Sequence, residues 1–163
     1  MVYLLDANVF MEAKNRHYGF DTVPGFWDWL DREHARGVVF SIQAVRKELL
    51  KKGDELADWA EGCADGFFLH PNRTTHEAVA TVNHWVDAQP RFVEEARRRF
   101  RKGADPLLVA QALTSSSVVV THEVSEPGSK VKAKLPDVCT GMKVEYMNPF
   151  QMLRAEKAVF VLS

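Results

Sequence analysis

The sequence contains few cysteines and no apolar run long enough to cross a membrane. Its only two cysteines, Cys63 and Cys139, are too few and too far apart for a zinc framework or a disulfide scaffold, which favours a reducing compartment. No apolar run approaches the roughly 20 residues of a transmembrane helix, and no signal-like segment precedes Tyr3. We therefore expect a cytoplasmic protein without a membrane partner.

The sequence also has no large excess of charge of either sign. The net charge is -1 although 26% of the residues are charged, so any surface for nucleic acid must be local. One predicted helix carries the only strongly basic cluster, which consists of Arg97, Arg98, Arg99, Arg101 and Lys102. We expect this cluster either to bind phosphate groups of RNA or to form an exposed helix end that pairs with Glu94 and Glu95.

Short apolar segments alternate with amphipathic ones along the chain. A length of 163 residues with 46% hydrophobic content predicts one domain, residues 1–163, with a sizeable core. Strands are predicted at residues 2–5, 38–40, 67–71, 118–120 and 143–147. Because helices of this length separate strands of a parallel sheet, we expect an α/β fold. Residues 156–163 are expected to be an edge strand or a tail.

The predicted helices have recognisable start and stop signals. They are expected at residues 24–36, 42–60, 75–86, 92–102 and 106–113, and a last helix is expected to begin at Asn148 and Pro149. Asp105 precedes Pro106 and is predicted to cap its helix, and Asp137 is predicted to cap a short one.

Two predicted buried strands run directly into an acidic residue or stop just before one. Asp6 follows the first strand and Glu123 follows the strand at 118–120, so both should lie at the carboxyl edge of the sheet. Asp105 and Glu48 can reach the same edge if their helices turn those faces inward. The alternatives are that Asp6 merely caps the next helix and that Glu48 lies on a solvated face with Lys52 as its ion-pair partner.

Carboxylates gathered in one place need a positive partner. At about 4 Å each pair repels by on the order of 4 kcal/mol at an effective dielectric constant near 20. Oxygen ligands with few histidines favour Mg²⁺ or Mn²⁺, and such an ion can activate water and stabilise charge on a phosphodiester. A zinc peptidase is disfavoured because neither His76 nor His122 is followed by a histidine at helical spacing. The predicted reaction is phosphodiester hydrolysis.

Several segments together resemble a known family. YLLDANVF, VRKEL, GADPLLVAQA and VVTHE are similar to motifs of PIN domains, the metal-dependent ribonuclease fold of many prokaryotic toxins. LLDANVFMEAKN, PGFWDWL, VTHE and LPDVC resemble, more narrowly, a prokaryotic PIN branch of mostly unassigned function. The resemblance implies a three-layer α/β/α domain with a mostly parallel sheet. It also implies RNA cleavage to 5′-phosphate and 3′-hydroxyl ends, a cognate antitoxin and a capacity to form homodimers.

The resemblance also assigns residues. The four acids of the family correspond to Asp6, Glu48, Asp105 and Glu123. Thr121 matches a hydroxyl that often precedes the fourth acid, and Asn8 lies in the loop of the first acid. The family more often has aspartate at the fourth position, and Asp137 is the alternative there. Two other functions stay open: a catalytically silent PIN-like RNA-binding or scaffold module, and a DNA-directed metal nuclease.

Overall fold

Five parallel strands form the centre of the molecule in the order β3-β2-β1-β4-β5. The computed structural model describes residues 1–162. The strands are β1 (Tyr3–Leu5), β2 (Val39–Ile42), β3 (Phe68–Leu69), β4 (Val118–Val120) and β5 (Tyr146–Met147). The predicted α/β class and the predicted strand positions are confirmed, although several strands are shorter than expected.

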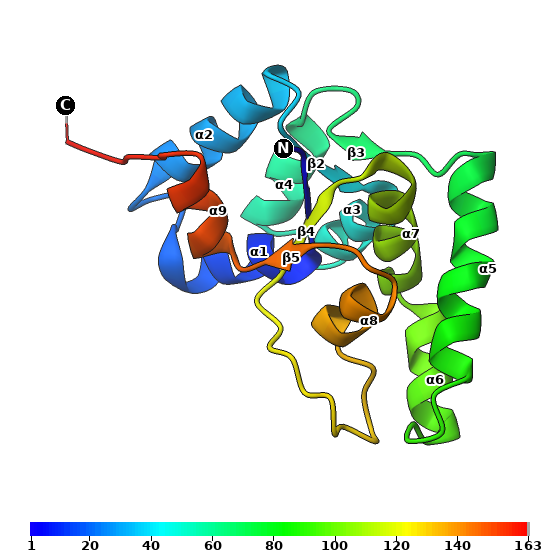
Figure 1. Ribbon diagram of the computed structural model, residues 1–163. Helices are drawn as coiled ribbons and strands as arrows, with labels where there is room; N and C mark the ends of the chain where they lie inside the picture. The colour runs from blue at the N-terminus through cyan, green and yellow to red at the C-terminus, as the bar shows by residue number, and fades with distance from the viewer. Residues whose placement is uncertain (163) are drawn as a thin grey trace.

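Helices cover both sides of this sheet. They are α1 (Ala7–Glu12), the π-helix η1 (Ala13–His17), α2 (Pro24–Ala35), α3 (Gln43–Leu50), α4 (Glu55–Gly62), α5 (Arg73–Asp87), α6 (Glu94–Lys102), α7 (Asp105–Ser115), α8 (Leu135–Gly141) and α9 (Pro149–Ala155). Figure 1 shows α5, α6 and α7 together on one side of the strands, with α2 and α9 on the other. The arrangement is the expected α/β/α one.

The central strand β1 is apolar because neighbours surround it on every side. Tyr3 lies opposite Val39 of β2 and Val118 of β4, and all three residues of β1 are fully buried. A strand buried on both faces cannot carry an alternating polar pattern, which explains the continuous apolar run at the start of the sequence.

The helix predicted over residues 42–60 is wrong in its length, because the chain makes two helices there. Gly53 adopts a positive φ of 57°, a conformation that glycine tolerates and a continuous α-helix excludes. Asp54 then begins α4, since its side chain accepts a hydrogen bond from the backbone N–H of Ala57 at 3.1 Å.

Two predicted helix caps are also wrong. Ala104, not Asp105, is the N-cap of α7, and Asp105 is the first residue of the helix. Lys134 is the N-cap of α8, so Asp137 lies inside its first turn. The prediction that Asn148 begins the last helix is correct, because its side chain accepts a hydrogen bond from the backbone of Gln151 at 2.8 Å.

The chain after α9 forms no strand within residues 156–162, so the edge strand predicted there is wrong for these residues and the alternative of a tail is correct. Ser163 lies outside the described residues. β5 is the edge strand of the sheet beside β4. No helix within residues 1–162 combines the length and the apolar character that a membrane span requires.

Candidate functional site

Asp6 lies at the carboxyl edge of the sheet, next to Thr121. β1 and β4 pair with Leu5 opposite Val120, so the residues that follow these two strands are neighbours. Asp6 Oδ1 accepts a hydrogen bond from the backbone N–H of Ala7 at 2.8 Å, and Oδ2 accepts one from Thr121 Oγ1 at 2.9 Å. Asp6 therefore caps α1 and also lies at the edge of the sheet. The predicted helix cap and the predicted position at the carboxyl edge are both correct.

The hydroxyl group of Thr121 organises the surrounding loop. Its oxygen accepts hydrogen bonds from Asn8 Nδ2 and from the backbone N–H of Glu123, both at 3.1 Å. Asn8 Oδ1 in turn accepts a hydrogen bond from the backbone N–H of His122 at 3.1 Å. Because the oxygen is used as an acceptor, the single hydroxyl proton is directed at Asp6. The network fixes the carboxyl group of Asp6 and the backbone at Glu123.

The charges of other acids act on Asp6. The pKa of Asp6 is raised to about 6, mainly because its carboxyl group is buried. The negative charges of Glu123 and Glu48 raise this pKa further, whereas the hydrogen bonds from Thr121 and Ala7 lower it. Asp6 can thus exchange a proton near neutral pH unless a cation compensates its charge.

Asp105, at the first turn of α7, shares this environment. Burial of its carboxyl group raises its pKa well above the ordinary value, and the charges of Asp6, Glu123 and Glu48 act in the same direction. Lys132 opposes them. The charges of Glu48 and Glu123 therefore act on both Asp6 and Asp105.

Glu48 is the most peripheral of the four acids. It is half-buried on α3, and burial raises its pKa while Lys51 lowers it. The alternative ion pair with Lys52 is not formed within residues 1–162. Glu48 instead borders a small pocket with Lys14 and Asp54, a pair joined at 2.8 Å.

Lys132 is the residue of this site that sequence reasoning missed. Its ammonium group forms an ion pair with Glu123 Oε1. Although burial lowers the pKa of Lys132, the hydrogen bond to Glu123 and the charges of Glu123, Asp105 and Asp6 raise it overall. The sequence did contain a signal for this contact, because the loop between Glu123 and Asp137 carries several lysines.

Glu123 and Asp137 have different roles. Glu123 Oε2 accepts a hydrogen bond from the backbone N–H of Leu135 at 3.2 Å, and its charge acts on both Asp6 and Asp105. Asp137 is buried, and its two oxygens accept hydrogen bonds from Ser125 Oγ at 2.5 Å and from a backbone N–H at 2.8 Å. Asp137 therefore holds the loop after β4, and its charge is not among those that act on Asp6 and Asp105.

The donors present suit a hard cation held by few protein ligands. No three Asp, Glu, His or Cys side chains within residues 1–162 converge closely enough to hold an ion by themselves. Mg²⁺ usually binds one or two carboxylates, keeps several waters and contacts substrate phosphate. Asp6 and Asp105, both oxygen donors with raised pKa values, fit such a site.

The arginines of α6 are largely paired with nearby acids. Arg98 and Arg99 contact Glu95, whereas Arg101 contacts Asp87 at 2.5 Å and Glu94 at 3.1 Å. These contacts agree with the alternative that the cluster forms an exposed helix end whose arginines pair with Glu94 and Glu95.

The remaining members of the basic cluster differ in their partners. Arg97 lies 3.6 Å from Glu94 and donates a hydrogen bond to the backbone oxygen of Gln89 at 2.9 Å. Lys102 has no ion-pair partner in the part of the chain that the structure describes. Arg99 also lines a cavity of about 300 Å³ together with Asp105 and Lys132.

Comparison with known proteins identifies one family. The family model described as "Domain of unknown function (DUF4411)" matches residues 3–160, which is nearly the whole chain. Among curated proteins, no sequence matches.

Proposed function

The chain belongs to the DUF4411 family, and we propose that it is a divalent-metal-dependent endoribonuclease with a PIN-like fold. The observation that carries this proposal is the group of mutually interacting carboxylates at the carboxyl edge of a parallel sheet, where the pKa of Asp6 is raised to about 6. Such a group is costly for the fold unless a cation offsets its charge. Hydrolysis of a phosphodiester bond is the reaction that this chemistry supports best.

Asp6 and Asp105 are the residues that would hold Mg²⁺ or Mn²⁺, and Glu48 and Glu123 would orient water beside them. When bound, the ion activates water and offsets charge on the phosphodiester. Thr121 holds the carboxylate of Asp6 in one orientation, so that binding requires little rearrangement. Lys132 and Arg99 line the cavity at Asp105 and can donate hydrogen bonds to phosphate oxygens.

We further propose that the enzyme acts in the cytoplasm as the toxin of a toxin-antitoxin pair. Both cysteines are free thiols, as a reducing compartment requires. The antitoxin and the homodimer are proposals that follow from the PIN-like motifs. Size-exclusion chromatography with light scattering would test the dimer.

A catalytically silent RNA-binding or scaffold module is the second candidate. It is favoured by the engagement of Glu123, whose oxygens contact Lys132 and the backbone of Leu135. DNA cleavage is the third candidate, and the substrate comparison below separates it from RNA cleavage.

A cleavage assay tests the proposal directly. Purified protein should hydrolyse single-stranded RNA with Mg²⁺ or Mn²⁺, should stop when the metal is chelated, and should leave single-stranded and duplex DNA intact. Asp6→Asn should abolish cleavage, whereas Asp28→Asn, an exposed position on α2, should not. Undiminished cleavage after exhaustive chelation would contradict a metal-dependent mechanism. Retained RNA binding without any cleavage would support the silent module.

A further inference from the structure

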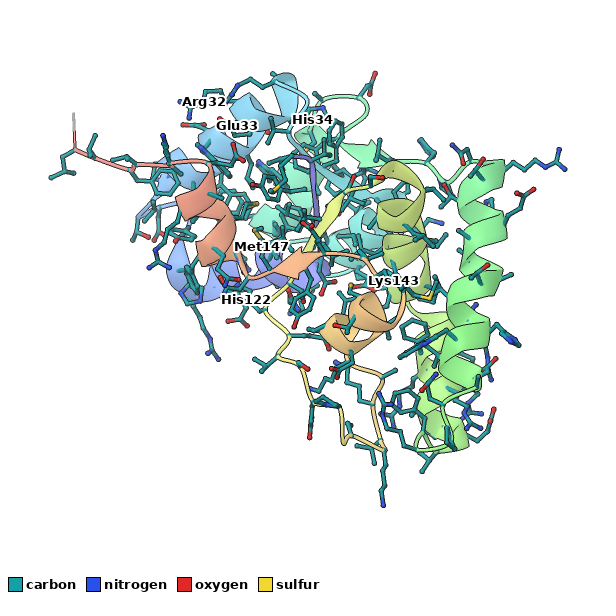
Figure 2. All side chains as sticks on the ribbon, in the orientation of Figure 1. Arg32, Glu33, His34, His122, Lys143 and Met147 are labelled. Atoms are coloured by element: carbon teal, nitrogen blue, oxygen red, sulfur yellow. The ribbon has the colours of Figure 1, made fainter. Side chains whose placement is uncertain are left out.

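Another cavity, of about 420 Å³, opens beside Glu123. It is lined by residues 121–125, which follow β4, and by residues of β5 and the start of α9, namely Tyr146, Met147, Asn148, Phe150 and Gln151. Figure 2 shows His122, from the segment after β4, near Met147 of β5, and both residues line the cavity. Thr121 and Glu123 belong both to the wall of this cavity and to the acidic site.

Flat side chains gather at this cavity. The rings of His122 and Phe150 lie 5.7 Å apart in a nearly perpendicular arrangement, and His17 contacts both of them. Tyr146, on the edge strand β5, is 41% exposed. Aromatic faces of this kind are the platforms on which proteins stack the bases of single-stranded nucleic acids.

Hydrogen-bond donors are available at the same place. The side-chain oxygens of Asn148 and Gln151 accept hydrogen bonds from each other's backbone N–H groups, at 2.8 and 2.9 Å. Their NH2 groups form no hydrogen bond within residues 1–162, so these groups can donate to carbonyl oxygens on the edge of a base. Lysine and arginine are absent from the described residues that line the cavity, which makes it unsuited to a phosphate group.

We propose that this cavity binds a nucleobase of the single-stranded RNA whose phosphodiester lies at the acids. The inference rests on the proposed function and adds to it a base-binding subsite formed by Tyr146, Phe150 and His122. The shared wall at Thr121 and Glu123 places the base next to the phosphodiester, and the aromatic rings and amide donors match its faces and its polar edge.

Binding without cleavage tests the subsite. Fluorescence anisotropy in EDTA would compare a fluorescein-labelled 12-nucleotide single-stranded RNA with an abasic RNA of the same length, which keeps the ribose-phosphate backbone. Wild-type protein should bind the RNA with bases more tightly. Tyr146→Ala and Phe150→Leu should each reduce this preference about 5- to 150-fold, the range expected for loss of one stacked base.

Matched variants separate stacking from a general loss of structure. Tyr146→Phe keeps the ring and should bind like the wild type. Phe20→Leu replaces an equally half-buried ring that stacks on Trp27, outside the cavity, and should also keep the preference. Thermal melting curves would establish that each variant is folded.

The outcomes distinguish this inference from the proposed function. If Tyr146→Ala and Phe150→Leu bind both RNAs as the wild type does, the subsite is wrong, whether or not the protein cleaves RNA. If the base preference depends on Tyr146 but no metal supports cleavage, the subsite stands and the endonuclease proposal fails. Loss of binding to a protein partner in these variants, with RNA binding unchanged, would also overturn the subsite.

Discussion

At the scale of single residues, the side chain of Thr121 alone positions several groups of the site. One hydroxyl accepts hydrogen bonds from Asn8 and Glu123 and donates its proton to Asp6. The hydrogen bond from Thr121 lowers the pKa of Asp6 against the larger effect of burial. The first acid is therefore held in one orientation while remaining costly to ionise, and a bound cation relieves that cost.

Asp6→Asn should stabilise the metal-free protein at neutral pH. The folded-state pKa of Asp6 is about 6 against an ordinary value of 3.8, so the native state binds the proton more tightly than the unfolded state. Stability from this group is complete below about pH 4 and decreases as the pH rises to about 6, by roughly 3 kcal/mol. Urea denaturation in EDTA from pH 4 to 8 should show a smaller decrease for Asp6→Asn. A variant less stable than the wild type at pH 7.5 would instead mark Asp6 as a structural residue.

Lys132→Met should make the acidic site bind metal more tightly. The substitution keeps an unbranched apolar chain but removes the only cation that pairs with Glu123 in the described structure. Titration calorimetry with Mn²⁺ should give a dissociation constant at least about fivefold lower, equivalent to about 1 kcal/mol. Lys130→Met is the matched control, because Lys130 is exposed on the same loop. Equal affinities for the two variants would exclude an electrostatic role for Lys132.

At the scale of elements, the loop after β4 and helix α8 depend on each other. Asp137 of α8 accepts hydrogen bonds from Ser125 and from the backbone of Glu126, while Glu123 of the loop accepts one from the backbone of Leu135. Helix α8 thus holds the segment that carries Glu123.

Substitutions at the two acids of this segment should therefore have different effects. Asp137→Asn should lower the free energy of unfolding by about 1–2 kcal/mol, because a charged acceptor of two hydrogen bonds is lost. Glu123→Gln should leave stability nearly unchanged, raise the metal concentration needed for cleavage and lower the rate. Denaturation curves and metal-dependent rates would be measured on both variants. Loss of cleavage by Asp137→Asn at unchanged stability, with a silent Glu123→Gln, would reverse the assignment.

Helix α6 offers a comparison within a single basic segment. Arg98 and Arg99 both pair with Glu95, but only Arg99 lines the cavity at Asp105. Arg99→Glu should weaken RNA binding and reduce the slope of log K against log salt by about 0.7, the value expected for one phosphate contact on a single strand. Arg98→Glu makes the same change in charge and should keep the wild-type slope. Identical slopes for both variants would mean that Arg99 does not contact an RNA phosphate and that the basic cluster is purely structural.

At the scale of the whole molecule, the parallel sheet places residues that are distant in the sequence next to one another. Thr121 and Asp6 are 115 residues apart and share a hydrogen bond, because β1 and β4 are neighbours in the sheet. Asp105 reaches the same edge from the first turn of α7, the helix that leads into β4. The carboxyl edge gathers side chains that no local interaction would bring together.

Metal binding should stabilise the entire fold. Mn²⁺ at 100 times its dissociation constant should add about 2.7 kcal/mol, which corresponds to an increase in melting temperature of about 5–10 °C for a chain of this size. Differential scanning calorimetry with and without EDTA would measure the increase. Asp6→Asn should show a smaller increase, and Asp28→Asn should match the wild type. An equal response in all three proteins would place the metal elsewhere.

Local chemistry was sufficient to predict the strands and to place Asp6 at the carboxyl edge of the sheet. The apolar runs at β1 and β4 mark buried strands wherever they lie, and an acid directly after such a run can only lie at the edge of the sheet. The predicted start of α9 was equally local, since Asn148 and Gln151 are three residues apart and cap each other's backbone.

Only the tertiary structure decided which charges meet. The ion pair between Lys132 and Glu123 and the hydrogen bonds of Asp137 depend on how one loop folds back onto α8, and no periodic pattern encodes that path. The break between α3 and α4 likewise depends on the positive φ of Gly53. The apolar pattern of the sequence continues through this position and predicted a single helix. Sequence determines the periodic elements because their hydrogen bonds are local, whereas the partners of a buried charge are set by long-range packing, which no single segment contains.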